Sequence, residues 1–431
     1  YFATTADTTT FIGFKAGQGI TSAKLTGNHN VAVGANAGLL LQGAAAENTV
    51  VGTDSGDAIT TGTRTVAVGY NAGGGITTGD SNVAIGWQAL LTEDAHSNNV
   101  AVGASALQTQ NAGAHAYNVA VGFEAGKLLT SGTKNIAVGA LAMDAIVTGT
   151  ENIAIGHEAA TDLTSGTGNI IIGTEAGLNL TDSDDNVVIG KAALQASGVA
   201  GNNIAIGAQS LRVNTSSNNL AIGHSALKAN TSGLSNVAIG HEAMLTNVDG
   251  DRNTAVGYEA LRLMEPSDAQ IYNVAVGYYA GGTITTGDKN VAIGGLAGQK
   301  DDGSTTLQDG DNNVLIGYGT HPSASGGANQ IVLGKGTAGH ANSTFVFGKD
   351  DGSDRVHNTF TSNATFTRVS DERYKKDIQT NTDCGLDFIN ELRTVTFKFK
   401  AKSEIPNTLP DYDAEKTTAE HTDKLYGLIA Q

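Results

Sequence analysis

Apolar and small residues recur along most of this chain in one short phrase, repeated about every 17 residues. The phrase runs Asn, apolar, small, apolar, Gly, two variable residues and Ala, and it reads NVAVGANAG at Asn30–Gly38 and NVAIGHEAM at Asn236–Met244. Turn-forming stretches such as LTSGTK and NTSSNN separate the phrases. A period of this size predicts a solenoid in which each phrase is one strand, stacked on the same strand of the next coil.

Each phrase is anchored by a glycine that fixes the period. Twelve of the nineteen intervals between anchors equal 17 residues, and the others run from 14 to 23. The anchors are Gly13, Gly34, Gly52, Gly69, Gly86, Gly103, Gly122, Gly139, Gly156, Gly173, Gly190, Gly207, Gly223, Gly240, Gly257, Gly277, Gly294, Gly317, Gly334 and Gly348. Glycine suits a point where a strand ends in a sharp turn or passes close to a neighbour. The pattern predicts an all-β fold, a parallel β-solenoid (β-roll) of about twenty coils.

Counted from the anchor glycine as position 0, the strand is apolar on both faces. Positions −3 and −1 are mostly Val or Ile, whereas position −2, on the other face, is mostly Ala and never charged. A strand that is apolar on both faces is buried on both, yet a thin coil has only one interior. We therefore expect a homotrimeric fibre in which partner chains cover one face, with small Ala side chains allowing close approach. The alternative is a monomeric solenoid covered by a helix or loop.

Composition narrows the class of protein further. The chain has 57 Gly among 431 residues, a single cysteine, Cys384, and a formal net charge of −17. One cysteine excludes an intrachain disulfide framework, and the negative charge argues against nucleic acid or an anionic membrane as a partner. No run of 18 apolar residues is present, so no membrane insertion is expected. No metal or cofactor is expected, because the Asp-rich loops match no EF-hand and Asp is common in turns.

The character of the sequence changes after the last anchor. We expect residues 1–348 to form the repeat shaft, residues 349–369 a connecting strand or stem, and residues 370–431 a small α+β unit. Within that unit, the apolar spacing of Asp377–Leu392 predicts a helix, and the alternation of Thr394–Lys400 predicts a strand.

Three motifs of this last unit occur in the same order in a known family. SDERYKKDI begins at Ser370, GLDFINELRTVTFKFK at Gly385 and YGLIAQ at Tyr426. They resemble the opening of the self-cleaving intramolecular chaperone domain of endosialidase-type phage tailspikes and tail fibres. One departure is Tyr374, where the family usually has Leu. The repeats are similar in style to those in the heads of trimeric autotransporter adhesins and in phage fibres. The resemblance implies that residues 370–431 are the N-terminal part of a domain that drives trimerisation of the fibre and then cuts the chain.

The resemblance also implies roles for individual residues. The cut would fall at the Val369–Ser370 bond, with Ser370 as the nucleophile, Lys375 as the general base, and Asp371 and Arg373 in support. A hydroxyl becomes a useful nucleophile when a nearby base takes its proton, and burial lowers the pKa of a lysine enough for that role. Without the flanking motifs, the same stretch would read as an exposed helix start capped by Ser370.

On the shaft, aromatic side chains recur at position +1, directly after the anchor glycine. If the coils stack in register, these rings form ladders along the rod, and exposed rings suit stacking on sugars. The candidate ligand-binding residues are Tyr70, Trp87, His224, His241, Tyr258 and Tyr278. The alternative is a ladder that only stabilises the solenoid. Glutamates repeat at position +2 and are expected to splay into water or to pair with neighbouring chains, because stacked like charges repel.

Together these features predict a phage tail fibre or similar appendage that attaches to a host surface, with a glycan as the favoured receptor. Its partners would be further copies of itself, a host glycan or protein receptor, and other tail proteins, and it would lie in the virion tail. The alternatives are a trimeric adhesin on a bacterial cell surface and a passive spacer within a fibre. A depolymerising tailspike would need an inserted pair of carboxylates, and no interval exceeds 23 residues. The only catalysis predicted is therefore a single self-cleavage.

Overall fold

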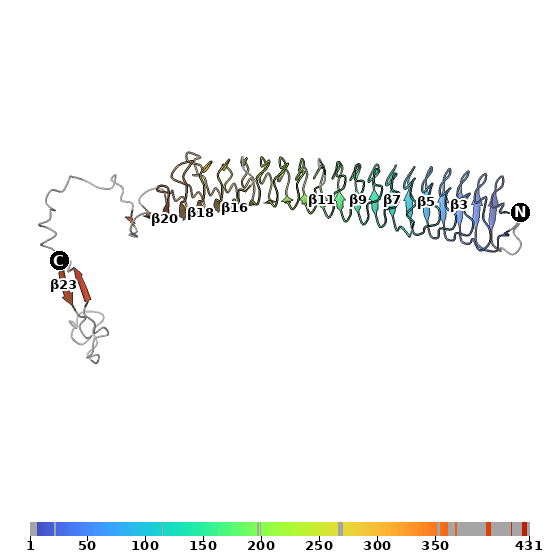
Figure 1. The fold of residues 1–431 in the computed structure, drawn as a ribbon, viewed down its shortest axis with the longest axis horizontal. Coiled ribbons are helices and arrows are strands. Elements are labelled where there is room, and N and C mark those ends of the chain that lie inside the picture. Colours follow the sequence, from blue (N-terminus) through green and yellow to red (C-terminus); the bar gives the residue numbers. More distant parts are fainter. Residues whose placement is uncertain are drawn as a thin grey trace. The chain divides into compact units, whose positions relative to one another are not determined.

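The computed structural model confirms a parallel β-solenoid. It describes residues 7–20, 23–113, 115–195, 198, 200–265, 270–350, 354–360, 367–368, 394–397, 415 and 425–428. The chain divides into two compact units, Tyr1–Ser370 and Asp371–Gln431. In the first unit, strands β1 to β20 pair in parallel with their neighbours in the sequence, and each strand lies in register with the next. Figure 1 shows the strands stacked along one rod.

Nineteen of these strands contain three residues each, and β20 contains five. Their bounds are β1 Thr10–Ile12, β2 Val31–Val33, β3 Thr49–Val51, β4 Val66–Val68, β5 Val83–Ile85, β6 Val100–Val102, β7 Val119–Val121, β8 Ile136–Val138, β9 Ile153–Ile155, β10 Ile170–Ile172, β11 Val187–Ile189, β12 Ile204–Ile206, β13 Leu220–Ile222, β14 Val237–Ile239, β15 Thr254–Val256, β16 Val274–Val276, β17 Val291–Ile293, β18 Val314–Ile316, β19 Ile331–Leu333 and β20 Thr344–Gly348. No α-helix occurs in the part of the chain that the structure describes.

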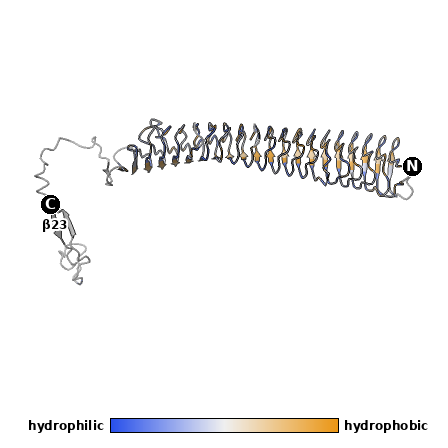
Figure 2. Cartoon of the chain, in the orientation of Figure 1, coloured by the Kyte–Doolittle hydropathy of each residue, from blue (hydrophilic) through white to orange (hydrophobic). Residues whose placement is uncertain are grey.

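The direction in which the two faces of each strand point differs from the prediction made from the sequence. The small residue at position −2 points into the coil, where Ala67 and Ala154 are fully buried. The Val and Ile at −3 and −1 point outward, and Ile85 and Ile155 remain 38% and 39% exposed. The expectation that Ala faces the partner chains is therefore wrong: Ala faces the interior, and Val and Ile form an apolar outer face. In Figure 2 these strands stand out as a hydrophobic row along the rod.

The thinness of the coil explains this orientation. Opposite the strand, the Ala at position +3 and a large residue at +7, such as Ile76, fill the interior. A Cβ added to Gly73 would lie 2.9 Å from Cδ1 of Ile76 and 3.4 Å from Cβ of Ala67. The space between the two walls of the coil therefore suits Ala at −2, and core positions packed this closely tolerate extra volume poorly.

The anchor glycines are stacked so closely that no side chain fits. A Cβ on Gly139 would lie 2.3 Å from the carbonyl oxygen of Gly156, and the same overlap recurs at successive anchors. The φ of Gly139 is +136°, a conformation that residues with a side chain rarely adopt. The expectation that the anchor passes a close neighbour is confirmed.

A column of buried asparagines at position −4 joins the coils. The Nδ2 of Asn152 donates to the carbonyl of Gly166 at 2.7 Å, and its Oδ1 accepts from the backbone N–H of Asn169 at 3.0 Å. The column comprises Asn30, Asn48, Asn82, Asn99, Asn118, Asn135, Asn152, Asn169, Asn186, Asn203, Asn219, Asn236, Asn253, Asn273, Asn290 and Asn313, with Thr65, Gln330 and Thr344 in three further coils. These amides satisfy backbone groups that the strand pairing leaves over.

We predict that Asn152→Ala lowers the free energy of unfolding by about 2–4 kcal/mol. The substitution leaves the Gly166 carbonyl and the Asn169 N–H buried without these partners, and each such group costs roughly 1–3 kcal/mol. Asn152→Thr is the matched control, because Thr65 occupies the same position in another coil. Chemical denaturation should show a smaller loss for Thr than for Ala. Equal losses would show that the hydrogen bonds of the column are not what stabilises the coil.

An antiparallel meander follows the last parallel strand. β21 (Arg355–Thr359) pairs antiparallel with β20, and β22 (Thr367–Arg368) pairs antiparallel with β21. The rings of His340 and His357 stack here, with centroids 3.7 Å apart. Burial lowers the pKa of His357, and the nearby His340 and Arg355 lower it further.

We expect this histidine pair to make the meander less stable in acid. Because the pKa of His357 is lower in the folded chain than in the unfolded one, its stabilising contribution is complete above the unfolded value, about 6.5, and declines as the pH falls below it. We expect the amide protection factors of β21 to drop between pH 7.5 and pH 5.5. His357→Phe, which keeps a ring but cannot gain a proton, should reduce that drop. A drop of equal size in both proteins would assign the effect to other groups.

In the second unit, β23 (Thr394–Phe397) pairs antiparallel with β24 (Leu425–Leu428). The strand expected at 394–400 is therefore confirmed over its first four residues. The helix expected at 377–392 lies outside the described residues.

Candidate functional site

The aromatic residues at position +1 form a stack along one stretch of the shaft, as expected. His224, His241, Tyr258 and Tyr278 stand on four successive coils. The ring centroids of successive members are 5.2, 5.1 and 5.4 Å apart, with interplanar angles of 15°, 7° and 13°. This stacking follows from the in-register strands, which set neighbouring coils about 4.8 Å apart.

The stack leaves little ring face free for a ligand. Within it each inner ring is covered on both faces by its neighbours, so mainly ring edges and the two outermost faces are open. This geometry favours the structural role for His241 and Tyr258. Exposure alone does not separate the rings, because Tyr278 of the stack is 59% exposed. What distinguishes Tyr70 and Trp87, which are 50% and 51% exposed, is that neither makes a ring contact with another described residue. These two rings are the better placed for stacking on a sugar.

Beside the stack, glutamates at position +2 pair with cations of their own chain. The Nε of Arg262 lies 3.1 Å from Glu242 and 3.3 Å from Glu259, on successive coils. Glu124 pairs in the same way with Lys127, at 3.0 Å. The expectation that these carboxylates splay into water or pair with neighbouring chains is therefore wrong for these three, because a basic residue at +5 reaches back to them.

One cluster has a geometry that could hold a metal ion. His241, Glu242 and Glu259 each bring a ligand atom to within 4.8 Å of the others. However, Arg262 already contacts both carboxylates, and a cation would have to compete with its positive charge. The cluster is better explained as an ion-pair network.

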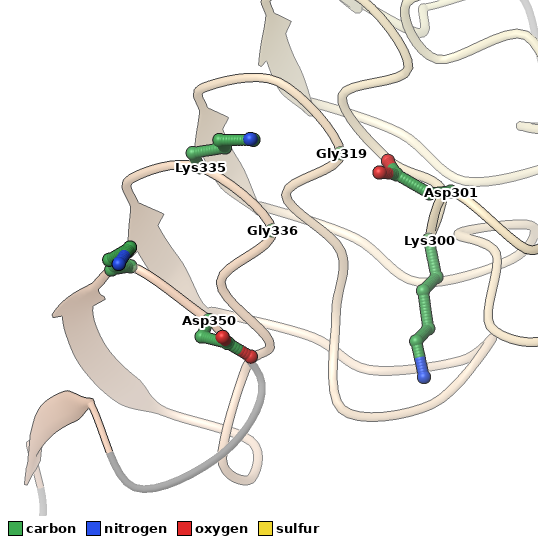
Figure 3. Close-up of a pocket in the computed structure, with 7 residues that line it drawn as sticks. Lys300, Asp301, Gly319, Lys335, Gly336 and Asp350 are labelled. Carbon is green, nitrogen blue, oxygen red and sulfur yellow. The ribbon is translucent and has the colours of Figure 1, made fainter.

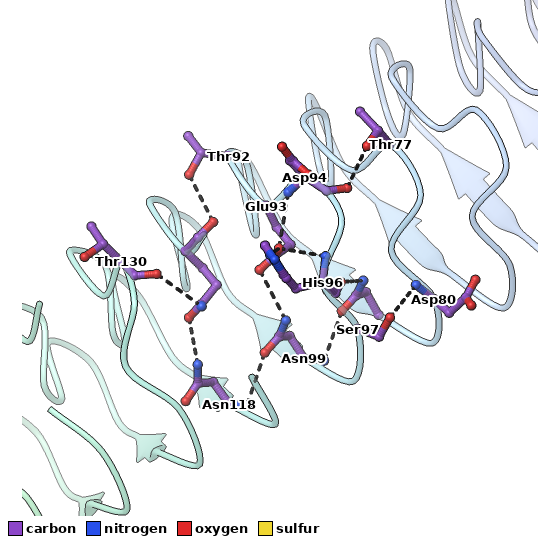
Figure 4. A network of polar contacts seen from close by, with 12 residues as sticks. Thr77, Asp80, Thr92, Glu93, Asp94, His96, Ser97, Asn99, Asn118 and Thr130 are labelled. Atoms are coloured by element: carbon purple, nitrogen blue, oxygen red, sulfur yellow. Dashed lines mark hydrogen bonds and ion pairs between the residues drawn. The ribbon is translucent and has the colours of Figure 1, made fainter. Parts of the chain in front are cut away.

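A second polar cluster lies inside the shaft (Figure 4). Glu93 is fully buried at position +7, where nine other coils carry Leu or Ile. Its Oε1 lies 2.7 Å from Nδ1 of His96, and its Oε2 accepts from Asn99 at 3.4 Å. Burial raises the pKa of Glu93, and the hydrogen bond with His96 partly offsets this. Because the Glu93 carboxylate has no exposed surface, it cannot reach an external substrate, and the cluster is structural. The sequence reasoning missed it because Glu93 stands among turn-forming residues.

The residues predicted for self-cleavage lie outside the described residues. These are Ser370, Lys375, Asp371 and Arg373, together with Val369 on the other side of the predicted cut. The last described strand of the first unit, β22, ends at Arg368. A cut at the predicted bond would therefore leave all of β20, β21 and β22 on the shaft side.

The comparison with known families bears directly on this end of the chain. Residues 370–431 match the protein family described as chaperone of endosialidase. The chain carries an endosialidase-type chaperone segment. The matched range begins at Ser370, the predicted nucleophile. No curated protein matches the chain.

This chaperone segment follows a fibre-like β-solenoid, and its family implies that the solenoid forms a homotrimer and is cut from the segment. The half-exposed outer face of Val and Ile is consistent with an assembly of several chains. No helix of membrane-spanning length and hydropathy occurs in the part of the chain that the structure describes.

Proposed function

We propose that this chain is a phage tail fibre, a homotrimer that attaches to a host surface glycan after its chaperone segment has been cut away. The observation that carries the proposal is the chaperone match directly after a long parallel solenoid. The same family supports an extracellular appendage as the place of action.

The outer face of the shaft supports the assembly. Along the rod, positions −3 and −1 present Val and Ile that are partly exposed in the single chain, including Val121, Ile189 and Ile293. A continuous apolar stripe of this length marks an interaction surface on a soluble protein. Three copies packed through this stripe would remove it from water. Burying a fully exposed Val or Ile contributes about 1.5–3 kcal/mol. Since these side chains are only 36–37% exposed in the single chain, covering each would contribute roughly a third of that.

Attachment would use the residues that flank this stripe. Exposed rings at position +1, chiefly Tyr70 and Trp87, offer apolar faces of the kind that stack on sugars. Three chains that repeat such contacts give avidity from individually weak sites. Self-cleavage would begin with attack of the Ser370 hydroxyl on the carbonyl of Val369, with Lys375 accepting the hydroxyl proton. The Val369–Ser370 C–N bond then breaks, Lys375 returns the proton to the departing Ser370 amine, and an ester joins the two residues. Water hydrolyses this ester, which leaves a carboxylate on Val369 and restores the Ser370 hydroxyl.

The test is a panel of immobilised bacterial surface polysaccharides probed with the purified, cut protein. We expect binding to at least one polysaccharide, reduced at least tenfold by the double variant Tyr70→Ala/Trp87→Ala. The control is Phe14→Ala/Phe123→Ala, which removes two exposed rings at the same position elsewhere on the shaft. Absence of binding to every polysaccharide, for a protein shown to be trimeric and cut, would favour the passive spacer instead.

A further inference from the structure

A pocket lies near the end of the shaft that carries β20, among four successive coils. It is lined by Lys300, Asp301, Gly319, Lys335, Gly336, Lys349 and Asp350 and encloses about 260 Å³. Ligand sites for drug-sized molecules typically span about 300–1,000 Å³, so this pocket has the size for about one sugar residue. Figure 3 shows Asp301 beside Gly319, with Lys335 on the neighbouring coil.

Two lysines of this pocket occupy the same position on neighbouring coils. Lys335 and Lys349 both occupy position +1, on coils whose strands β19 and β20 are paired in register. Both side chains are exposed, and no ion pair of either occurs among the described residues. Elsewhere, residues that share a position on neighbouring coils carry opposite charges: Nζ of Lys134 lies 2.7 Å from Oε1 of Glu151. Like charges directly opposite each other are unfavourable, and an anion bound between the two lysines would relieve this repulsion.

The glycines of the pocket explain why it is open. In other coils position +2 carries a side chain, and the backbone there is left-handed all the same, as at Glu124 with φ 54° and Glu242 with φ 53°. Gly336 has φ 62° at this position, so its backbone conformation does not demand glycine. What its missing side chain provides is space: the nearest atom to an added Cβ is the Lys349 carbonyl oxygen, at 3.8 Å. Because Gly336 has no side chain, this coil also lacks the carboxylate that pairs with a basic residue at Glu124 and Glu242.

The charges of the lining define the ligand. Lys300 lies 3.5 Å from Asp302, outside the lining, so its charge is already paired. The lysines left to face a ligand are Lys335 and Lys349, beside Asp301 and Asp350. One carboxylate can be shared between the two lysines, whereas a multiply charged phosphate would face repulsion from the two aspartates. The two aspartates can accept hydrogen bonds from hydroxyl groups. A ligand with one carboxylate and several hydroxyls satisfies both sets of groups.

We propose that this pocket binds an acidic sugar residue of the uronic acid type, with Lys335 and Lys349 facing the carboxylate and Asp301 and Asp350 accepting from the hydroxyls. The proposal rests on the proposed function and makes it more specific, because it names a charged class of surface glycan and a site separate from Tyr70 and Trp87. In a chain of net charge −17, these lysines would also draw an acidic glycan to one end of the shaft.

In the experiment, the full protein is titrated with trigalacturonic acid and, separately, with the neutral galactose trisaccharide. Ligand-observed NMR measures the binding of each. We expect binding of the acidic trimer only. Lys335→Gln/Lys349→Gln should weaken it at least tenfold, and so should Gly336→Glu, which restores the carboxylate found at +2 in other coils. The matched control, Lys134→Gln/Lys228→Gln, removes two positive charges elsewhere on the shaft and should bind as the parent does.

The proposal would be overturned by equal binding of the acidic and neutral trimers, by unchanged affinity in both pocket variants, or by equal loss in the control. Displacement of the acidic trimer by inorganic phosphate at equal concentration would also overturn it. Unaltered melting temperatures show that the variants fold, and Gly336→Glu tests the pocket without removing any lysine. If the polysaccharide panel shows binding while trigalacturonic acid does not bind, this inference fails and the proposed function stands. If neither binds, both fail.

Discussion

Replacing Ser370 with alanine is expected to leave the chain at full length, whereas the parent chain is expected to lose residues 370–431. The reason is chemical: the predicted reaction begins with attack by the Ser370 hydroxyl, and alanine offers no nucleophile. Lys375→Ala should have nearly the same effect, because a serine hydroxyl without a base is a weak nucleophile. Intact mass spectrometry of the denatured protein measures the outcome directly, as one mass or as two fragments.

The neighbouring lysine provides the control for this experiment. Lys376→Ala removes the same charge one residue further along the motif and should still be cut. If Lys376→Ala and Lys375→Ala behave alike, the assignment of the base is wrong. If Ser370→Ala is still cut at the Val369–Ser370 bond, the nucleophile assigned from the family resemblance is wrong.

Replacing an anchor glycine is expected to destabilise the shaft more than any other single change in a coil. In Gly139→Ala the new methyl group would stand 2.3 Å from the Gly156 carbonyl oxygen. The overlap is with backbone that is itself held in the strand ladder, so it cannot be relieved by a rotamer change. A positive φ for a residue with a side chain adds about 1–3 kcal/mol. We expect a total loss of more than about 3 kcal/mol in the free energy of unfolding.

Gly198→Ala is the matched control for this substitution. Nothing lies within 4 Å of a Cβ added at Gly198. Thermal unfolding followed by circular dichroism should therefore show a large drop for Gly139→Ala and almost none for Gly198→Ala. A loss below about 1 kcal/mol at Gly139 would show that the coils can move apart, and that the close stacking of anchors is not required.

The period of the sequence was enough to predict the solenoid, because the in-register pairing of β1 to β20 follows directly from the spacing of the anchors. The orientation of the strands was not predictable in the same way. Positions −2 and −1 are both apolar, so no polar residue marked the solvent side, and only the thin interior decides that Ala67 points inward. The asparagine column was also missed as a structural element, because Asn is common in turns and carries no sign of burial in the sequence.

Some features of the candidate sites were also predictable from the sequence, and others were not. The shared register of the rings at 224–278 predicted their stacking, and the structure confirms it. The sequence did not show that this stacking covers ring faces, since that depends on side-chain rotamers. The lysine pocket gave no signal at all, because it is created by missing side chains at Gly319 and Gly336 in a chain with 57 glycines. Lys335 and Lys349 became notable only when their stacking was seen.

The central claim is that three solenoid shafts assemble through their outer Val and Ile faces and are then freed of the chaperone segment. Native mass spectrometry of the purified full-length gene product tests it most directly. The account predicts one species that contains three shaft chains, each ending at Val369. A monomeric shaft, cut or uncut, would contradict the account, because the apolar outer face would then remain in water along the whole rod.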